Sequence, residues 1–490
     1  MYLYYHFEDA KEKKDRGGER MKNKCLKRTL AVLLAGITVL STGGCGKQQV
    51  AVMEPMEVEE VYTMGFDFIG GKDVMPIYGG ISVTTHGTSV NGNTMPDLYT
   101  DEIFERIAEC GINMTVASPQ YQESPELIYK TLELGKKHNI GVVISDELIQ
   151  TEVLNGYVPT TEELGAQVSK YSHYPAFCGV KVVDEPGTEY LQPGTTGQRL
   201  IKYYVPIFNS LHDLGIFASG NMFGVNDEFK FDKYKRMLDE YCSTCNPKYL
   251  SWDTYVWDTW VKKDIYFQNM DMIRTYANKY KIPFWGYAQA GAQWNDDKKY
   301  FDSKEYYPTE GQFHWSVNTL LAAGAKGINY FPLIQPLYFA QAESTDYDFQ
   351  RNGLLGAYGN KTQWWYYAKD ANAQIAAMDS VLMNSVSKGV IATGKEAVSH
   401  FKGTDMYMKE TSWRELKEVE GNTMIGCFNY YGKSVLYVVN YEWDYAQKIT
   451  LTLQDTYNMS MIREAKETKI TANKLELDMQ PGEGILLVFE

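Results

Sequence analysis

From residue 75 onward, short apolar runs alternate with longer amphipathic stretches along the chain. The runs have the length of buried strands, and the stretches between them carry apolar residues at helical spacing. The predicted strands are residues 75–83, 112–118, 140–147, 177–185, 216–223, 249–255, 283–289 and 327–334, and the predicted helices include residues 96–111, 124–139, 161–175 and 264–281. Eight strand–helix units predict an α/β fold, a (β/α)8 TIM barrel. An open doubly wound sheet would need a Gly-rich phosphate turn after its first strand, and "GGISVTTHGTSV" is not one.

The pattern changes near residue 387, after a helical stretch at 362–385 that closes the barrel. Alternating apolar and polar residues, interrupted by turns, predict antiparallel strands at 388–394, 422–443, 448–453, 461–467, 474–479 and 484–490. We therefore expect the barrel over residues 63–386 and a C-terminal antiparallel β-sandwich over residues 387–490.

The N-terminal residues have the pattern of a targeting segment. Basic residues precede an apolar run at 30–40 that is too short to span a bilayer, which is the layout of a secretory signal peptide. The stretch "STGGC" resembles the lipobox of bacterial lipoproteins, although Thr42 stands where that motif usually carries Leu. This resemblance implies that Cys45 is lipidated.

Residues 1–20 precede a better start at Met21, and we interpret them as the product of a misassigned start. Residues 1–45 are then this extension plus a lipoprotein signal peptide, and residues 46–62 are a tether. The lipobox implies a lipid-anchored protein at the bacterial cell surface or extracytoplasmic face, with secretion as the alternative. Membrane contact is expected only through the lipid anchor.

Charge and composition narrow the possible partners. The chain has a formal net charge of -14 and a pI near 5.2, which argues against a nucleic-acid partner, because phosphate binding needs basic patches. The seven His residues are scattered without ligand spacing. We therefore expect no catalytic metal and no cofactor.

Functional residues of a TIM barrel lie at the carboxyl ends of its strands. The fourth predicted strand ends in Asp184 and Glu185, followed by Pro186. Adjacent carboxylates are costly if both ionise, so we expect Glu185 to hold a proton, as a general acid must. Neighbouring residues of a strand face opposite sides, so both acids reach one site only if the backbone bends before the proline.

The other strand ends are amide, acidic and aromatic. They supply Asn221, Trp252, Asp253, Tyr255, Trp285, Tyr287 and Gln289. Carboxylates and amides bind hydroxyl groups, and flat rings stack on the apolar face of a pyranose. This mixture indicates a neutral polyhydroxylated ligand, so the expected partner is an oligosaccharide or a glycoconjugate.

Three stretches carry a family resemblance. "GVKVVDEP", "LSWDTYVW" and "LLAAGAKGINYF" resemble the fourth-strand end, the sixth-strand end and the eighth βα unit of bacterial (β/α)8-barrel glycoside hydrolases, including β-galactosidase-like members. The resemblance implies that Glu185 is the general acid/base. In the large clan of retaining barrel enzymes the nucleophilic Glu ends the seventh strand, where this chain has Gln289.

The missing nucleophile leaves two mechanisms open. The Asp-Glu pair resembles that of substrate-assisted β-N-acetylhexosaminidases, in which Glu185 would protonate the leaving oxygen and Asp184 would orient the 2-acetamido group of a terminal β-linked GlcNAc or GalNAc. The alternative is a double-displacement β-galactosidase-like or β-glucosidase-like hydrolase with Asp253 or another acid as nucleophile. A non-enzymic alternative is a carbohydrate-binding lipoprotein.

Overall fold

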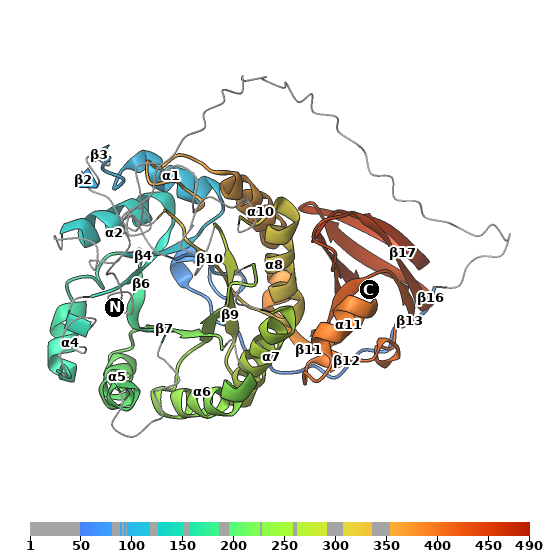
Figure 1. Ribbon diagram of the computed structural model, residues 1–490, viewed down its shortest axis with the longest axis horizontal. Helices are drawn as coiled ribbons and strands as arrows, with labels where there is room; N and C mark the ends of the chain where they lie inside the picture. Colours follow the sequence, from blue (N-terminus) through green and yellow to red (C-terminus); the bar gives the residue numbers. More distant parts are fainter. Residues whose placement is uncertain are drawn as a thin grey trace, which may run out of the picture. The chain divides into compact units, whose positions relative to one another are not determined.

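The computed structural model describes residues 50–80, 89–90, 93–94, 96–117, 126–146, 148–149, 157–185, 196–225, 228–257, 262–291, 307–335 and 353–490. Within them, a closed parallel barrel is followed by a β-rich C-terminal domain (Figure 1). The predicted fold class is confirmed.

The barrel strands coincide with the eight apolar runs. They are β1 (Ile77–Gly79), β4 (Met114–Ala117), β5 (Gly141–Ile144), β6 (Phe177–Asp184), β7 (Ala218–Phe223), β8 (Leu250–Asp253), β9 (Phe284–Gln289) and β10 (Ile328–Phe331). Each pairs in parallel with the next, and β10 pairs with β1 to close the barrel. The strands are apolar because helices cover their outer face and side chains fill the interior. A short hairpin of β2 (Ser89–Val90) and β3 (Asn93–Thr94) follows β1.

Helices surround the barrel (Figure 1). They are α1 (Asp101–Glu109), α2 (Glu126–His138), α4 (Thr161–Val168), α5 (Thr196–Asp213), α6 (Phe231–Cys245), α7 (Lys263–Tyr280), α8 (Glu310–Ala323) and α10 (Gln363–Met383), with a 3-10 turn, η4 (Glu228–Lys230), before α6. Sequence caps start several of them: Thr160 with Glu163 and Thr309 with Gln312 each form a reciprocal capping box.

The amino-terminal end of the barrel is plugged. The chain before β1 includes the 3-10 turn η1 (Asp67–Ile69), and Phe66 and Ile69 pack on a cluster inside the barrel that includes Trp285. The rings of Phe66 and Phe217 meet edge to face at 5.2 Å. Only the carboxyl end of the barrel is therefore left for a site.

The C-terminal domain is built on one long sheet. Its elements are β11 (Ser385–Thr393), α11 (Lys395–Phe401), β12 (Tyr407–Met408), η6 (Glu410–Ser412), β13 (Leu416–Glu420), β14 (Thr423–Tyr430), β15 (Lys433–Asn440), β16 (Gln447–Arg463), β17 (Lys466–Met479) and β18 (Gly484–Phe489). All pairings are antiparallel except that of β11 with β12. The first part of β16 pairs with β13 and its last part with β18, on either side of an irregularity between Thr452 and Tyr457. Apolar side chains such as Leu436 and Leu451 form the core of this domain.

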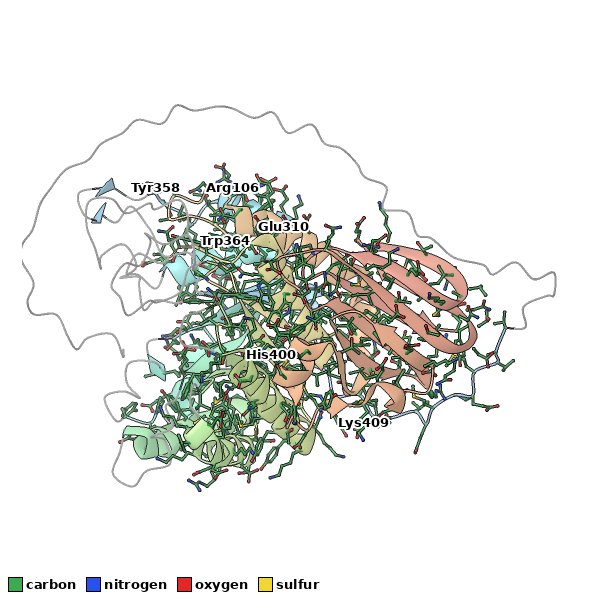
Figure 2. All side chains as sticks on the ribbon, turned by 45° about the vertical axis from the view of Figure 1, so that its right-hand side comes forward. Arg106, Glu310, Tyr358, Trp364, His400 and Lys409 are labelled. Atoms are coloured by element: carbon green, nitrogen blue, oxygen red, sulfur yellow. The ribbon has the colours of Figure 1, made fainter. Side chains whose placement is uncertain are left out.

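The two domains are fastened together by direct bonds. Asn318 of α8 donates to the Gly482 carbonyl (2.7 Å) and accepts from the Tyr437 hydroxyl (2.7 Å). On another side, Phe267 of α7 stacks on His400 of α11, which is labelled in Figure 2. These contacts hold the outer face of the barrel against the C-terminal domain.

The segment for which the sequence analysis expects a tether also contacts this domain. The amides of Ala51 and Met56 donate to the carbonyls of Thr456 and Gly432, both at 2.8 Å, and Lys388 pairs with Glu59. Residues 50–60 therefore lie along the C-terminal sheet.

Candidate functional site

The end of β6 is irregular, and this irregularity sets the direction in which the Asp184 side chain points. The register with β7 shifts between Lys181 and Val183, so that Asp184 lies on the same inner face as Lys181. Lys181 Nζ donates to Asp184 Oδ2 at 2.9 Å. The bulge therefore pairs the first acid with a cation inside the barrel.

Glu185 adopts a left-handed backbone with φ +46. Its amide donates to the Asn221 carbonyl of β7 at 2.9 Å, which extends the sheet pairing by one residue. A non-glycine residue in this region is uncommon and costs free energy, and such residues cluster at functional sites. The backbone turn swings Glu185 toward the end of β8 while Asp184 stays on the inner face.

Asp253 at the end of β8 meets Glu185 directly. Their carboxyl groups share a hydrogen bond, and Asn221 Nδ2 donates to Asp253 Oδ1 at 3.2 Å. Asp253 is only 5% exposed, whereas Glu185 is exposed at the mouth of the barrel. Burial first, and then the charge and hydrogen bond of Glu185, raise the pKa of Asp253 well above its usual range.

This arrangement changes which carboxyl group is expected to have the raised pKa. The sequence analysis places it on Glu185 because of its neighbour Asp184, and treats Asp253 as a substrate contact or a nucleophile. In the structure it is Asp253 of β8, two strands along the barrel from β6, whose pKa is raised, because its carboxyl group is removed from water and contacts Glu185.

Two tyrosines lie beside this carboxyl group. Burial, together with the charges of Asp253 and Glu185, raises the pKa of the Tyr255 hydroxyl well above its usual range. The Tyr287 ring lies over Gly80, where a Cβ atom would stand 3.0 Å from the ring. The structure thus brings Asp184, Glu185, Asn221, Asp253, Tyr255 and Tyr287 together at the end of the barrel.

Gln289 lies at the end of β9 and is 2% exposed. Its Nε2 donates to the Gly291 carbonyl at 2.9 Å, and its Oε1 has no partner among the described residues. An amide held in this way offers a carbonyl oxygen as a hydrogen-bond acceptor, but no nucleophile.

The two tryptophans are core residues. Trp252, 1% exposed, faces the helices and packs on Tyr266 of α7 at 5.5 Å. Trp285, 2% exposed, points into the closed end of the barrel, where it packs on Tyr249 at 4.4 Å. The predicted stacking wall is therefore corrected to a packing role, because inward and outward positions alternate along β8 and β9 and neither ring reaches the mouth.

Sequence reasoning missed several polar residues inside the barrel. Lys181 stands in an otherwise apolar strand, and Ser251 and Asn329 lie on inner faces of β8 and β10 next to Asn221. A charged residue in the middle of an apolar strand, such as Lys181, is a signal in the sequence that could have identified a polar site. The contacts of Ser251 and Asn329 depend on the register between strands, which the sequence does not reveal.

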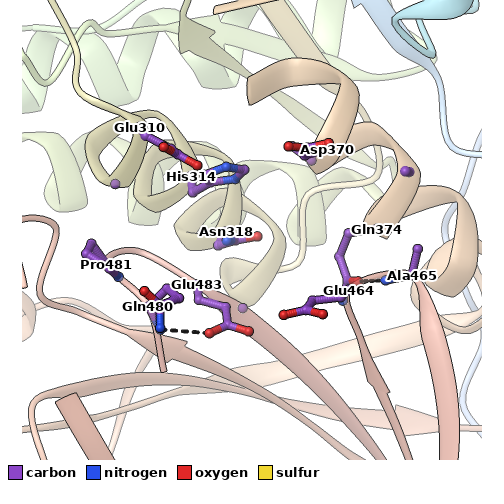
Figure 3. Close-up of a pocket in the computed structure, with 14 residues that line it drawn as sticks. Glu310, His314, Asn318, Asp370, Gln374, Glu464, Ala465, Gln480, Pro481 and Glu483 are labelled. Atoms are coloured by element: carbon purple, nitrogen blue, oxygen red, sulfur yellow. Dashed lines mark hydrogen bonds between the residues drawn. The ribbon is translucent and has the colours of Figure 1, made fainter. Parts of the chain in front are cut away.

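A separate recess of about 690 Å³ lies between the two domains (Figure 3). It is lined by α8, α10 and turns of the C-terminal domain, and it carries Glu310, Asp370, Glu464 and Glu483. No lysine or arginine is among its lining residues, and none of them comes from the end of a barrel strand. This recess is distinct from the carboxyl site.

Among the described residues, no group of three or more His, Cys, Asp or Glu side chains is placed to hold a metal ion. Within the same part of the chain, no helix is both long and apolar enough to cross a membrane. Cys45, the expected lipidation site, lies outside the described residues.

No protein-family model and no curated protein matches the chain. Solved structures resemble it at low identity. A β-galactosidase from the psychrophilic Marinomonas ef1 is 10% identical with a TM-score of 0.47, over 69% of this chain and 67% of that one. Eubacterium rectale Amy13B is 9% identical with a TM-score of 0.49, over 89% and 99%. The endo-β-1,4-mannanase of Thermotoga petrophila is 10% identical with a TM-score of 0.40, over 84% and 92%. With every TM-score below 0.5, the chemistry must be argued from the residues of this chain.

Proposed function

We propose that the protein is a glycoside hydrolase that removes terminal β-linked sugars from an oligosaccharide or glycoconjugate. The observation that carries the proposal is the Glu185–Asp253 pair, in which an exposed carboxyl group contacts a buried one of raised pKa. Glycoside hydrolysis needs an acid that is still protonated at neutral pH beside carboxylates that are not. The contact between a buried carboxyl group of raised pKa and an exposed one at the end of this barrel supports the proposal.

Glu185 would be the general acid/base, a role supported by its exposure at the end of the barrel and its contact with Asp253. It would protonate the glycosidic oxygen as the bond to the anomeric carbon breaks, and then deprotonate the water that completes hydrolysis. Asp184, held by Lys181 at 2.9 Å, would orient the substrate. Tyr255, Tyr287 and Gln289 would bind its hydroxyl or amide groups, whereas the Asn221 amide bonds Ser251 and Asp253 instead.

The contact between Glu185 and Asp253 favours substrate assistance. In retaining enzymes that use a protein nucleophile, the two carboxyl groups stand about 5 to 5.5 Å apart on either side of the anomeric carbon. Glu185 and Asp253 are instead hydrogen-bonded to each other, which leaves no room for a sugar between them. An attack by the 2-acetamido oxygen of the substrate needs no such gap. We therefore propose a β-N-acetylhexosaminide substrate.

The proposed site of action follows from the sequence. A signal peptide and a lipidated Cys45 would anchor the enzyme to the extracytoplasmic face of the membrane, where it would have access to oligosaccharides and glycoconjugates. Mass spectrometry of the mature N-terminus tests this part of the proposal separately.

The decisive experiment is hydrolysis of paired chromogenic β-glycosides, with a 2-acetamido or a 2-hydroxyl group, by the mature chain. We expect turnover of the acetamido substrates only and strong inhibition by a thiazoline that copies the cyclised intermediate. Glu185→Gln should lower kcat on the order of 10²-fold or more. Asp146→Asn is a matched control, because Asp146 lies just after β5 at the same end of the barrel but bonds to Tyr171 and Gln167.

Each outcome is informative. Cleavage of 2-hydroxyl substrates with covalent labelling of a carboxylate by a 2-deoxy-2-fluoro glycoside would replace substrate assistance by double displacement. Equal activity of Glu185→Gln and the wild type would remove Glu185 from the mechanism. Binding of oligosaccharides without any hydrolysis would leave the carbohydrate-binding alternative.

A further inference from the structure

A chain of buried hydrogen bonds crosses the interior of the barrel beneath the acids. Asn329 Nδ2 of β10 donates to Ser251 Oγ of β8 at 3.1 Å, and Ser251 Oγ donates to Asn221 Oδ1 of β7 at 2.8 Å. Asn221 Nδ2 then donates to Asp253 Oδ1 at 3.2 Å. Every member is at most 7% exposed, so water does not compete for these bonds.

The chain has a fixed direction. A serine hydroxyl has one proton; with that proton donated to Asn221, Ser251 accepts from Asn329, and the Tyr249 hydroxyl is a further hydrogen-bond partner of Ser251. This holds the carbonyl of the Asn221 amide toward Ser251 and its NH₂ toward Asp253. Since Oδ1 of Asp253 already accepts a hydrogen bond, the carboxyl proton is directed to the other oxygen.

We propose that Asn329, Ser251 and Asn221 are positioning residues that aim the proton of Asp253 at Glu185, making Asp253 the proton reservoir of the acid/base. This inference rests on the proposed function for its catalytic meaning. In the first half-reaction the O–H bond of Asp253 breaks, its proton passes to Glu185, and Glu185 delivers a proton to the leaving oxygen. In the second half-reaction the attacking water gives a proton to Glu185, which returns it to Asp253. One proton leaves and one returns in each turnover.

The strain at Glu185 agrees with this role. Its left-handed backbone and the bond from its amide to the Asn221 carbonyl bring the acid to the same residue whose side chain holds Asp253. Asn221 thus touches both carboxyl residues, one through its backbone and the other through its amide. The hydrogen-bonded residues Asn329, Ser251, Asn221 and Asp253 form a relay, which ends at the contact between the carboxyl groups of Asp253 and Glu185.

The test removes the middle of the relay. Ser251→Ala frees the Asn221 amide, so the hydrogen bond that lowers the pKa of Asp253 is lost. We expect the basic limb of the pH profile of kcat/KM to move up by about one pH unit, the scale of one lost hydrogen bond to a carboxylate. KM should change little and kcat should fall. Ser251→Thr, which keeps the hydroxyl, should restore the wild-type profile.

Thr115→Val is the matched control. Thr115 of β4 is another buried hydroxyl of a barrel strand, on the face toward the helices, where it donates to the Gly79 carbonyl at 3.3 Å and lies outside the relay. We expect this variant to keep the wild-type pH profile. Asn329→Leu removes the first donor and provides a second relay variant if Ser251→Ala does not fold.

A readout without substrate separates this inference from the proposed function. In protein with ¹³C-labelled aspartate, the Asp253 carboxyl signal, assigned by its loss in Asp253→Asn, should titrate about one pH unit higher in Ser251→Ala. An unchanged titration in both relay variants, or an equal shift in Thr115→Val, would overturn the relay even if the enzyme is active. The expected shift in a protein that hydrolyses no glycoside would support the relay and reject the proposed function.

Discussion

Lys326 offers a stability test of how the two domains are joined. The side chain is 5% exposed, at the start of β10, and its ammonium group donates to the carbonyls of Leu382, in the last turn of α10, and Ser385, the first residue of β11. Burial lowers the pKa of Lys326 from 10.5 to about 7. The lysine therefore holds the junction between the domains by its hydrogen bonds, while its charge is costly in the folded state.

The sign of the pH dependence follows from this shift. Below pH 7 the folded and the unfolded chain both carry the proton, and the folded state bears the full cost of the buried charge. Between pH 7 and pH 9 the folded chain releases the proton while the unfolded chain keeps it, so stability rises with pH. Integration over this interval gives a contribution of about 2 kcal/mol to the free energy of unfolding.

Lys326→Met isolates this contribution. The variant keeps the apolar stem and removes the buried charge, but it leaves two buried carbonyls without their donor, a loss of about 1–3 kcal/mol that does not itself depend on pH. Because the other titrating groups are shared, the wild type should gain about 2 kcal/mol relative to the variant between pH 7 and pH 9.

Urea unfolding at constant ionic strength, followed by tryptophan fluorescence and circular dichroism, measures this difference. Coincidence of the two signals tests whether the domains unfold together. Lys136→Met, on the exposed face of α2, is the control and should show no such gain. A wild-type minus Lys326→Met difference that is the same at both pH values would refute the reasoning.

Two further substitutions test the packing. Trp285→Ala should lower the free energy of unfolding by about 3–5 kcal/mol, the usual cost of deleting a buried indole, and should change KM for glycosides by less than about twofold because the ring lies in the closed end of the barrel. Gly426→Ala places a Cβ atom 2.2 Å from the Ala322 carbonyl of α8, so calorimetry should show destabilisation of at least about 1–3 kcal/mol, whereas Gly165→Ala on α4, with its nearest contact at 3.4 Å, should be neutral or stabilising.

The barrel was predictable because each of its strands is an apolar run bounded by turns or helix caps. The C-terminal domain shows where this signal weakens. Residues 448–453 and 461–467 are predicted as separate strands, but β16 runs from Gln447 to Arg463 without a break, and the turn follows at Glu464 and Ala465. Both turn residues have positive φ without being Gly or Asn, so the usual sequence signal of a tight hairpin is missing.

The acidic residues of the site could be found from the sequence, but the sequence did not show which of them has the raised pKa. Strand ends identify Asp184, Glu185 and Asp253, because catalytic groups of a barrel lie there. Burial and the contact with Glu185 raise the pKa of Asp253. That contact depends on a bulge in β6 and a left-handed residue, and neither has a clear signal in the sequence. The prediction that the two tryptophans stack on sugar was wrong for a related reason. Only the strand register shows whether an inward ring lies at the mouth of the barrel or at its closed end.

Charge at the barrel mouth ties the proposed chemistry to the fold. Lys181 pairs with Asp184, and Glu185 contacts Asp253, whose pKa is raised, so the negative charge of the three carboxyl groups is partly offset. On the proposed function, that charge faces an anomeric carbon that becomes positive as the glycosidic bond breaks, and a partly buried carboxylate stabilises it more strongly than water would. A fully neutralised site would lose this attraction. The bulge that brings Lys181 to Asp184 and the turn that brings Glu185 to Asp253 are therefore the two local distortions on which the proposed activity depends.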